Sequence, residues 1–537
     1  MHDEVRGTAG TRHLDALLPL TAVAIAIAVH ARALGTYFAR DDITFLLRAA
    51  HHLPRPGLAR ILSTALAISI EHAAFGLSPV GYHVVNLALH AFNTLGVYAL
   101  ALRLSSDRRV AWLAAVCFGT SSIAFTPLNW VTGIVELLTA ACLLGATLAA
   151  WKPGPPRAAR VLAATLLLLA ALLSKETALP WVAVMLVAGR LSGRRAFPVR
   201  SLIPAGVLTA CVLGWFLAHG TGLDTTRGGA FAMRSAPTFL AANLATYFAW
   251  SVAAWNAIPD AIAAADADAW RLALPACVVL WLALGGLPGS RRTLIRAGAA
   301  WWLGFLLPVL PLANHTYYYY LYIPGIGGSI ALACLLSGLA DRLGARRASW
   351  ACAAVAAIHV GFQWRDVSLR SSALEDHLPI DVTIRDSQLI RHAVSGLESA
   401  ALPAGSAVGF VNPVSRPSAA PARGRSLGAG MDTTRSYIPL EAALRGGETL
   451  ALLAPALRYR GFSSTIPPDW LDVDCFRYEQ RGWLEYWGKA AAALRKQAQV
   501  QAQAGQAMAA ESTWSRVRAL DLAADTSAAV TSRRRPG

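Results

Sequence analysis

Long apolar segments recur along the first two thirds of this chain, and they constrain its fold more than any other feature. They begin near residue 16 and continue to about residue 363 of a 537-residue chain. The composition agrees, because the chain is 55% hydrophobic and only 15% charged. Apolar segments of about 20 residues match the thickness of a bilayer core. The sequence therefore predicts an all-α polytopic membrane protein with about 11–12 transmembrane helices.

Eleven segments are predicted to cross the bilayer because each is apolar and near spanning length. They lie at 16–35, 82–103, 110–127, 131–151, 161–174, 177–190, 201–218, 271–287, 297–312, 320–340 and 349–363. Basic residues cluster in the connections at 107–109, 152–160, 190–200, 291–296 and 342–347. The positive-inside rule places these connections in the cytoplasm, so the 36–81 loop and everything after 363 are expected outside it.

Segment 239–258 is also apolar enough to span the membrane. A single further crossing there would break the alternation of the basic connections, so it is predicted to lie in the outer interface or to re-enter it. If it does cross, the bundle has twelve spans.

The net charge of +17 would suggest a nucleic-acid partner in a soluble protein. Here the basic residues sit in short connections between apolar segments, where they set membrane topology, so no nucleic-acid partner is expected. The partner that the composition requires is a lipid bilayer. Abundant Ala and Arg favour a GC-rich bacterial source, hence the inner (plasma) membrane. Six of the seven Cys lie in apolar segments and none forms a CxxC pair, so no disulfide framework or zinc site is predicted.

The composition changes after residue 363, and it divides the chain into three parts. Residues 1–363 form the multi-span domain. Residues 364–490 are more polar, with Pro and Gly between short apolar segments such as Ala407–Val411 and Thr449–Leu453, which indicates strands of a small extracytoplasmic α/β module. Residues 491–537 are Ala- and Gln-rich, and they are predicted to be helical at first and disordered from about Asp521.

Two adjacent carboxylates, Asp41 and Asp42, follow the first apolar segment directly. Like charges side by side raise each other's pKa, which suits proton transfer near neutral pH. The alternative is an ordinary solvated acidic pair at the membrane surface. Both interpretations stay open on these residues alone.

The second span carries polar residues at helical spacing, namely His83, Asn86, His90 and Asn93. They share one helix face, and four polar side chains in lipid must face the bundle interior or a wet cavity. For His90 and Asn93, deep in the span, interhelical hydrogen bonding is expected. His83 lies near the outer surface, where it could meet the acidic pair.

Three further groups of polar residues are predicted at the same membrane surface. The first is Asn129 and Trp130 with Glu136 in the following span, and an intramembrane Glu is a candidate functional residue. The second is Lys175 and Glu176, either a local ion pair or a phosphate-binding turn. The third is a group of five tyrosines that includes Tyr320 and Tyr322, which suits an aromatic belt or stacking on a sugar ring.

The order of these motifs resembles the multi-span glycosyltransferases of the GT-C fold. An acidic pair, H-x-x-N-x-x-x-H-x-x-N, N-W-x-[ST]-G-x-x-[DE]-L-L, S-K-E and Y-L-Y-x-P-x-x-G follow one another between about residues 14 and 340. The resemblance is to the branch of protein O-mannosyltransferases and transmembrane-tetratricopeptide mannosyltransferases. Relatives usually carry H-P-x-H-x-E before the N-W turn. This chain has other residues at those places, which are Ser121, Ser122, Ala124 and Thr126.

The resemblance implies an enzyme with a polyprenyl-phosphate sugar donor and transfer on the extracytoplasmic face. It also implies a catalytic acid in the first outer loop, here Asp41 or Asp42. That carboxylate would take the acceptor's proton in an inverting transfer, and Lys175 or Arg40 would stabilise the leaving phosphate. The expected substrate-binding residues are Arg40, His83, Asn129, Trp130, Glu136, Lys175, Glu176, Tyr320 and Tyr322.

Several properties are left open by the sequence. The sugar is not specified, nor is the acceptor, which could be a protein, a lipid or a polysaccharide. No metal ligands are predicted, and a requirement for a divalent metal stays open. Two other functions compete with transfer, namely a transporter or flippase for a lipid-linked sugar and a non-catalytic membrane scaffold. A transporter usually shows internal repeats with acidic residues in mid-membrane, and the sequence shows no repeat.

Overall fold

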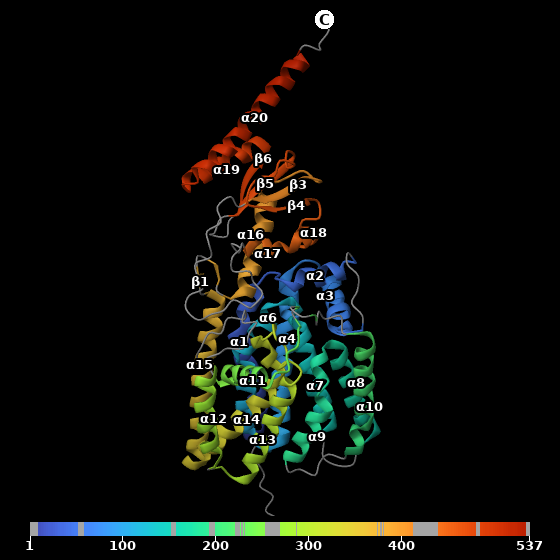
Figure 1. Ribbon diagram of the computed structural model, residues 1–537. Helices are drawn as coiled ribbons and strands as arrows, with labels where there is room; N and C mark the ends of the chain where they lie inside the picture. The colour runs from blue at the N-terminus through green and yellow to red at the C-terminus, as the bar shows by residue number, and fades with distance from the viewer. Residues whose placement is uncertain are drawn as a thin grey trace, which may run out of the picture.

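The computed structural model describes residues 9–51, 58–151, 157–192, 199–220, 226, 229, 231–252, 269–285, 287–372, 374–375, 378–379, 381–411, 439–478 and 484–532. These residues form two parts, a large helical bundle and a smaller module that contains a β-sheet. The module sits at one end of the bundle, and this end is called the module end below (Figure 1).

In the described residues the bundle contains fifteen helices in chain order, several of them joined by single helical turns. The first group is α1 (Ala9–His30), α2 (Asp41–Ala49), α3 (Ile68–Phe75), α4 (Pro79–Ser105), α5 (Arg108–Gly119), α6 (Phe125–Asn129) and α7 (Ile134–Ala150). The second group is α8 (Ala158–Ser174), α9 (Trp181–Leu191), α10 (Ile203–His219), α11 (Pro237–Val252), α12 (Ala269–Gly285), α13 (Gly289–Leu306), α14 (Tyr322–Ala340) and α15 (Ala345–Ser372).

Among the described residues, five helical segments are long and apolar enough to cross a membrane, or six if a pair bent by 41° counts as one span. The five are Leu17–Gly35, Pro79–Ser105, Val131–Ala150, Val199–His219 and Tyr318–Leu343, and the bent pair is Arg108–Gly119 with Ser122–Asn129. Other predicted spans correspond to shorter apolar helices such as α8 and α12. The chain is thus an all-α polytopic membrane protein with a small α/β module. The prediction for 239–258 stays untested, because residues 253–268 lie outside the described residues.

Small residues let two helices at the centre of the bundle pack closely. A Cβ added to Gly327 of α14 would lie 2.5 Å from the carbonyl oxygen of Gly298 in α13, and the reverse substitution is equally close. Only glycine fits at such a backbone approach. The glycine that ends the Y-L-Y-x-P-x-x-G motif therefore serves helix packing.

The module contains a four-stranded sheet in the order β4-β3-β5-β6, with β3 parallel to both neighbours and β6 antiparallel to β5. The strands are β3 (Ala407–Val411), β4 (Arg458–Ser463), β5 (Val473–Tyr478) and β6 (Leu484–Lys489), and a separate two-stranded pair joins β1 (Leu374–Glu375) to β2 (Leu378–Pro379). The module's helices are α16 (Val382–Ser399), α17 (Pro439–Leu444), α18 (Glu448–Leu453), α19 (Ala490–Gln503) and α20 (Ala507–Ser532).

Two local predictions differ from the structure, while the strand at Ala407–Val411 is confirmed. The segment predicted as a strand at Thr449–Leu453 is helix α18. The Leu and Ala residues of this segment favour helix. Gly447 precedes the helix with φ 102°, a left-handed backbone conformation that regular strands do not contain. The helix α20 also continues to Ser532, past the point where disorder was expected. Asp521 within it pairs with Arg495 of α19, at 2.9 Å between Nη2 and Oδ2.

One hydrophobic core joins the module to the module end of the bundle. Its buried members come from both parts: Phe38, Ile43, Leu46, Leu47, Ile68, Tyr82, Val131 and Ile134 from the bundle, and Leu389, Ile390, Val408, Phe410, Leu440, Leu444, Leu450 and Phe476 from the module. Because side chains of both parts interdigitate, the module is fixed against the loop that carries the acidic pair.

A buried ion pair reinforces this attachment. Arg370, near the end of α15, donates from Nε and Nη2 to Oδ2 of Asp381 at 2.9 and 2.7 Å. The same guanidinium donates to the carbonyl of Ser122 and to Oγ1 of Thr126, and it lies 4.1 Å from the ring centroid of Phe125. Asp381 in turn caps the first turn of α16 through its other oxygen. One guanidinium thus ties the bundle to the first helix of the module.

Candidate functional site

The two adjacent carboxylates occupy the first turn of α2 but point in different directions. Asp42 is fully buried, whereas the side chain of Asp41 is 55% exposed. Acidic residues are favourable in the first turn of a helix because the free backbone N–H groups there carry partial positive charge. The two adjacent carboxylates therefore have different surroundings and separate roles in the structure.

Asp42 holds a turn of the bundle in place. Its Oδ1 accepts from the backbone N–H and the hydroxyl of Thr132, at 2.8 and 3.0 Å, and its Oδ2 accepts from the N–H of Ala39 at 2.9 Å. Loss of hydration raises the pKa of the Asp42 carboxyl to about 7, although these hydrogen bonds oppose the shift. Asp42 thus connects the loop after α1 to the N-W-x-T-G turn and titrates near neutral pH.

Asp41 faces the module. Its Oδ1 lies 3.3 Å from Nη1 of Arg445, and the same guanidinium donates to Oγ1 of Thr44 and to Glu448. Ion pairs this exposed contribute little to stability. Asp41 is therefore held at the boundary between bundle and module while staying accessible to a ligand.

Arg40 lies between the acidic pair and the aromatic residues of the site. Its backbone is in an unusual conformation with φ 46° and ψ −116°, which costs a non-glycine residue free energy. The guanidinium Nε donates to Oδ2 of Asp386 in α16 at 2.9 Å, and the group lies 5.8 Å from the centroid of Trp130. The module therefore helps to position Arg40 over the indole ring.

The N-W-x-T-G turn is built from α6 and the short turn η4 (Val131–Gly133). Asn129 accepts from the hydroxyl of Thr36 at 2.7 Å and donates to the carbonyl of Phe125 at 2.9 Å. A Cβ on Gly133 would lie 1.9 Å from the carbonyl oxygen of Pro127, so the motif requires glycine here. Asn129 therefore shapes the turn, and its side chain is committed to internal hydrogen bonds.

The polar face of α4 fixes the same turn from the other side. Nδ2 of Asn86 donates to the carbonyl of Trp130 at 2.7 Å, and Nδ1 of His83 lies 2.9 Å from the carbonyl of Leu128. Nε2 of His83 has no hydrogen-bond partner among the described residues. Both side chains are fully buried. His83 thus approaches the site through the turn and makes no direct hydrogen bond to either carboxylate of the acidic pair.

Lys175 and Glu136 form a buried ion pair. Lys175 follows α8, and Glu136 stands in the first turn of α7. The ammonium also lies 4.7 Å from the ring centroid of Tyr320 and 5.5 Å from that of Tyr319. Aromatic faces attract a cation at these distances. The side chain of Lys175 is therefore placed by one carboxylate and two tyrosine rings.

Glu176 does not pair with Lys175, which was one of the two predictions for this turn. The short turn η5 (Glu176–Ala178) directs Glu176 toward Arg60, which donates to it from Nε at 3.0 Å and from Nη2. The nearby guanidinium lowers the pKa of Glu176 to about 2 despite burial. Sequence reasoning missed Arg60, because this residue is one of four Arg in the long 36–81 loop and nothing in the sequence indicates its partner 116 residues later.

The tyrosine segment completes the site. Tyr319 lies 5.9 Å from Trp130 and 4.7 Å from Tyr320 between ring centroids, and it stacks on Tyr317 at 5.5 Å. His315 lies beside this group, 4.4 Å from the ring of Tyr317, and burial lowers the pKa of His315 to about 3. We call the following residues the module-end cluster: Arg60, Trp130, Glu136, Lys175, Glu176, His315, Tyr317, Tyr319 and Tyr320.

Tyr322 lies apart from this cluster, inside the bundle. Its hydroxyl is 2.8 Å from Nδ1 of His90 and accepts from Nδ2 of Asn93 at 3.2 Å. Nε2 of His90 contacts the carbonyl of Gly119 at 2.8 Å. The interhelical hydrogen bonding expected for His90 and Asn93 is therefore observed, and Tyr322 belongs to that network between spans.

Glu71 is a second acidic residue near Asp42 that sequence reasoning did not place in the site. It lies in α3, it is 5% exposed, and neither of its carboxyl oxygens has a hydrogen-bond partner among the described residues. Burial, with a smaller contribution from the charge of Asp42, raises the pKa of Glu71 to about 8. An unpaired buried carboxyl favours its neutral form. Glu71 therefore carries a proton at neutral pH.

The described residues contain no group of three or more His, Cys, Asp or Glu side chains arranged to hold a metal ion. The acidic side chains of the site are instead engaged by backbone N–H groups, a hydroxyl, Lys or Arg, with Glu71 the exception.

Comparison with known proteins yields matches among solved structures only. No protein-family model matches the chain, and no curated protein matches it. Among solved structures it is similar to the oligosaccharyltransferase of Archaeoglobus fulgidus, crystallised with a tethered acceptor peptide that contains an NVT sequon. The TM-score is 0.40 with 14% sequence identity, over 74% of this chain and 62% of that chain.

Proposed function

We propose that this chain is an integral-membrane glycosyltransferase that moves a sugar from a polyprenyl-phosphate donor to an extracytoplasmic hydroxyl acceptor. The observation that carries the proposal is the module-end cluster. Cations, carboxylates and aromatic rings converge there from four separate segments of the chain, next to the loop that carries the acidic pair. Such convergence is typical of a site for a charged ligand with an apolar or ring face.

The proposed orientation agrees with the distribution of basic residues. Arg109 and Arg291 join Asp107 and Asp341 in an ion-pair network, with Arg291 to Asp107 at 2.8 Å and Arg109 to Asp341 at 2.9 Å. Asp341 directly follows α14, whereas the tyrosine segment directly precedes α14. Arg-rich connections favour the cytoplasm, so the module end is the extracytoplasmic end in this proposal.

We assign the role of proton acceptor to Asp41, because an acceptor hydroxyl must reach the base and Asp41 is the exposed member of the pair. In the proposed step, a carboxylate oxygen of Asp41 takes the proton as the hydroxyl oxygen attacks the anomeric carbon. The bond from that carbon to the phosphate oxygen breaks, and the phosphate leaves with the electron pair. A single displacement inverts the anomeric centre. Asp42 acts as a positioning residue that fixes the turn bearing Trp130.

The donor phosphate is assigned to Lys175 and Arg60. Each cation is already paired with one carboxylate, but only some of its N–H groups donate hydrogen bonds to that carboxylate. An ammonium donates three hydrogen bonds and a guanidinium five, whereas Glu136 and Glu176 take one from Lys175 and two from Arg60 in the structure. In this proposal the remaining donors bind phosphate oxygens, whose charge grows as the sugar leaves. Trp130 and Tyr319 offer ring faces to the sugar.

A non-catalytic scaffold is the competing function that one observation favours. Lys175 is neutralised by Glu136, and Arg60 is neutralised by Glu176. The cluster can therefore be stable without any ligand. A scaffold and an enzyme differ in whether the donor is consumed. The test is to incubate the purified protein, reconstituted in lipid, with radiolabelled polyprenyl-phosphate mannose, glucose or galactose in the presence of membrane extract as acceptor source.

The expected result is loss of label from at least one donor lipid, reduced by Lys175→Ala more than by Lys175→Arg, which keeps the charge. The matched control is Lys489→Ala, an exposed lysine of the module that lies 3.9 Å from Asp474. Equal donor consumption by Lys175→Ala and the control would remove Lys175 from donor binding. No consumption of any donor by the wild type would favour the scaffold.

A further inference from the structure

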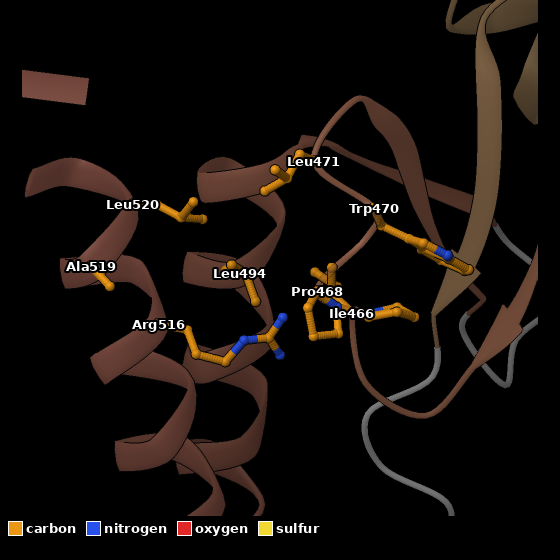
Figure 2. A pocket seen from close by; sticks show the side chains of 9 residues that line it. Ile466, Pro468, Trp470, Leu471, Leu494, Arg516, Ala519 and Leu520 are labelled. Carbon is orange, nitrogen blue, oxygen red and sulfur yellow. The ribbon is translucent and has the colours of Figure 1, made fainter. Parts of the chain in front are cut away.

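A cavity lies in the module at the joint between the sheet and the helices α19 and α20 (Figure 2). Its volume is about 200 Å³. One wall is the 464–472 connection between β4 and β5, and the other is formed by the two helices. The lining residues used below are Ile466, Pro468, Trp470, Leu494, Arg516 and Leu520. All except Arg516 present mainly carbon atoms, so the cavity is apolar apart from one cation.

The floor of the cavity is a tryptophan seated on the sheet. Trp470 is 5% exposed, and its ring lies so close to β3 that a Cβ on Gly409 would be 2.2 Å from it. Gly461 in β4 leaves room for the same ring, with 3.4 Å to a built Cβ. The wall next to it is fixed as well, because the N–H of Ile466 donates to Oε1 of Gln497 in α19 at 2.8 Å. The cavity is therefore pre-formed.

The helical wall is held by a buried hydrogen-bond network. Oγ1 of Thr513 in α20 lies 2.7 Å from Oε1 of Gln501 and 3.5 Å from Nε2 of Gln497, both in α19. All three side chains are buried. Networks of this kind fix the relative position of two helices. Arg516 stands one turn beyond Thr513, so its backbone is anchored at the cavity.

Among the described residues, Arg516 is a cation without a hydrogen-bond or ion-pair partner. Its guanidinium extends from α20 into the cavity, toward Pro468 and Leu494 (Figure 2). Within the described part of the chain it makes no hydrogen bond or ion pair. Neighbouring basic residues do have partners, since Arg518 pairs with Glu511 at 2.7 Å and Arg495 with Asp521 at 2.9 Å. A half-buried unpaired guanidinium beside an apolar cavity favours an anionic ligand with an apolar group.

We propose that this cavity binds the C-terminal residue of a partner polypeptide. The large apolar side chain of that residue fills the cavity against Trp470 and Leu494, and its terminal carboxylate binds Arg516. In a C-terminal residue the carboxylate is attached to the same Cα as the side chain, which matches a cavity of single-side-chain size with one cation beside it. A lipid tail is longer than the cavity, and the sheet and α19 lie at the end of the module away from the bundle (Figure 1).

The test uses the full-length protein in detergent and a fluorescent peptide, Gly-Ser-Gly-Ser-Leu with a free carboxylate, read by fluorescence anisotropy. Two further peptides separate the sources of charge: the same sequence as a C-terminal amide, and an amidated peptide with Leu-Asp in its interior. Arg516→Gln removes the cation. Arg518→Gln is the matched control, since this arginine lies on the same helix but pairs with Glu511. Ala519→Trp blocks the cavity from an exposed helix position.

The wild type is expected to bind the free-carboxylate peptide saturably. It should bind the amide about tenfold more weakly, and Arg516→Gln should bind the free-carboxylate peptide about tenfold more weakly, because each change removes one charge-assisted hydrogen bond. Ala519→Trp should abolish binding, and Arg518→Gln should bind as the wild type does. Unchanged melting temperatures for the variants confirm that they fold.

Three results would overturn the inference: no binding by the wild type, equal binding of acid and amide, or tighter binding of the interior Leu-Asp peptide. The inference does not depend on the proposed sugar transfer, because none of its residues belongs to the module-end cluster.

Discussion

Replacing Asp42 by Asn tests whether this carboxyl titrates near neutral pH inside the fold. In the unfolded chain an Asp is ionised above about pH 4, whereas burial raises the pKa of Asp42 to about 7 in the folded protein. Between these values the folded state binds more protons than the unfolded state. The free energy of unfolding of the wild type must therefore fall as the pH rises through this interval.

The magnitude follows from the two pKa values. Moving the pKa from 3.8 to about 7 corresponds to a loss of about 4 kcal/mol at most across the interval. Asn cannot titrate, so Asp42→Asn lacks this slope. Its oxygen can still accept from Thr132, but its NH₂ group faces the N–H of Ala39, which costs about 1–3 kcal/mol for an unsatisfied donor. The wild type should be the more stable protein at low pH, and the difference should shrink or reverse near pH 8.

The assay is the thermal melting of detergent-purified protein, measured from acidic to mildly alkaline pH. Glu71 and Tyr82 interact electrostatically with Asp42, so Glu71→Gln is measured alone and combined with Asp42→Asn to separate the two acidic residues. Asp469→Asn, an exposed carboxyl paired with Arg460 at 2.7 Å, is the control for loss of a surface charge. A pH dependence that is identical in the wild type and in Asp42→Asn would refute the reasoning.

Three further outcomes follow from the contacts described above. Gly133→Ala should destabilise the N-W-x-T-G turn by at least about 2 kcal/mol, because the new Cβ meets the carbonyl of Pro127; thermal melting measures this. Glu136→Gln should cost about 3–5 kcal/mol by leaving the buried ammonium of Lys175 unpaired, and the double variant with Lys175→Met should recover most of that stability. Arg370→Gln should loosen the module, seen as faster cleavage by protease near the end of α15, with little change in the melting of the bundle.

Periodicity and composition were sufficient to predict the class of the protein. The polytopic helical bundle follows from repeated apolar segments, and the small sheet follows from the changed composition after residue 363. The polar face of α4 was also predicted, because helical spacing puts His90 and Asn93 on one side of the helix. Polar side chains are unfavourable in lipid, so that side must face the bundle interior. Short segments such as Thr449–Leu453 were not predictable, because their apolar residues fit a strand as well as a helix. The outcome there depends on the backbone conformation of the neighbouring glycines.

The pairing of charges within the site depends on tertiary structure. Lys175 and Glu176 are adjacent in sequence, yet an extended residue and a tight turn send them to different partners, Glu136 and Arg60. The adjacent carboxylates of α2 diverge in the same way, because consecutive positions on a helix point about 100° apart. Sequence could identify most of the groups that meet at the module end, although not Arg60 or His315, and the partner of each charge required the fold.

The measurement that tests the central claim most directly compares sugar transfer by the wild type and by Asp41→Asn. Purified protein is supplied with radiolabelled polyprenyl-phosphate sugar and membrane extract, and the initial rate of label transfer is recorded. Asp469→Asn is the matched control, because its side chain is 62% exposed and paired with an arginine, as Asp41 is at 55%. The account predicts at least about a hundredfold loss of rate in Asp41→Asn, as for loss of a general base, with normal melting and a normal rate in the control. Transfer at the wild-type rate by Asp41→Asn would contradict it.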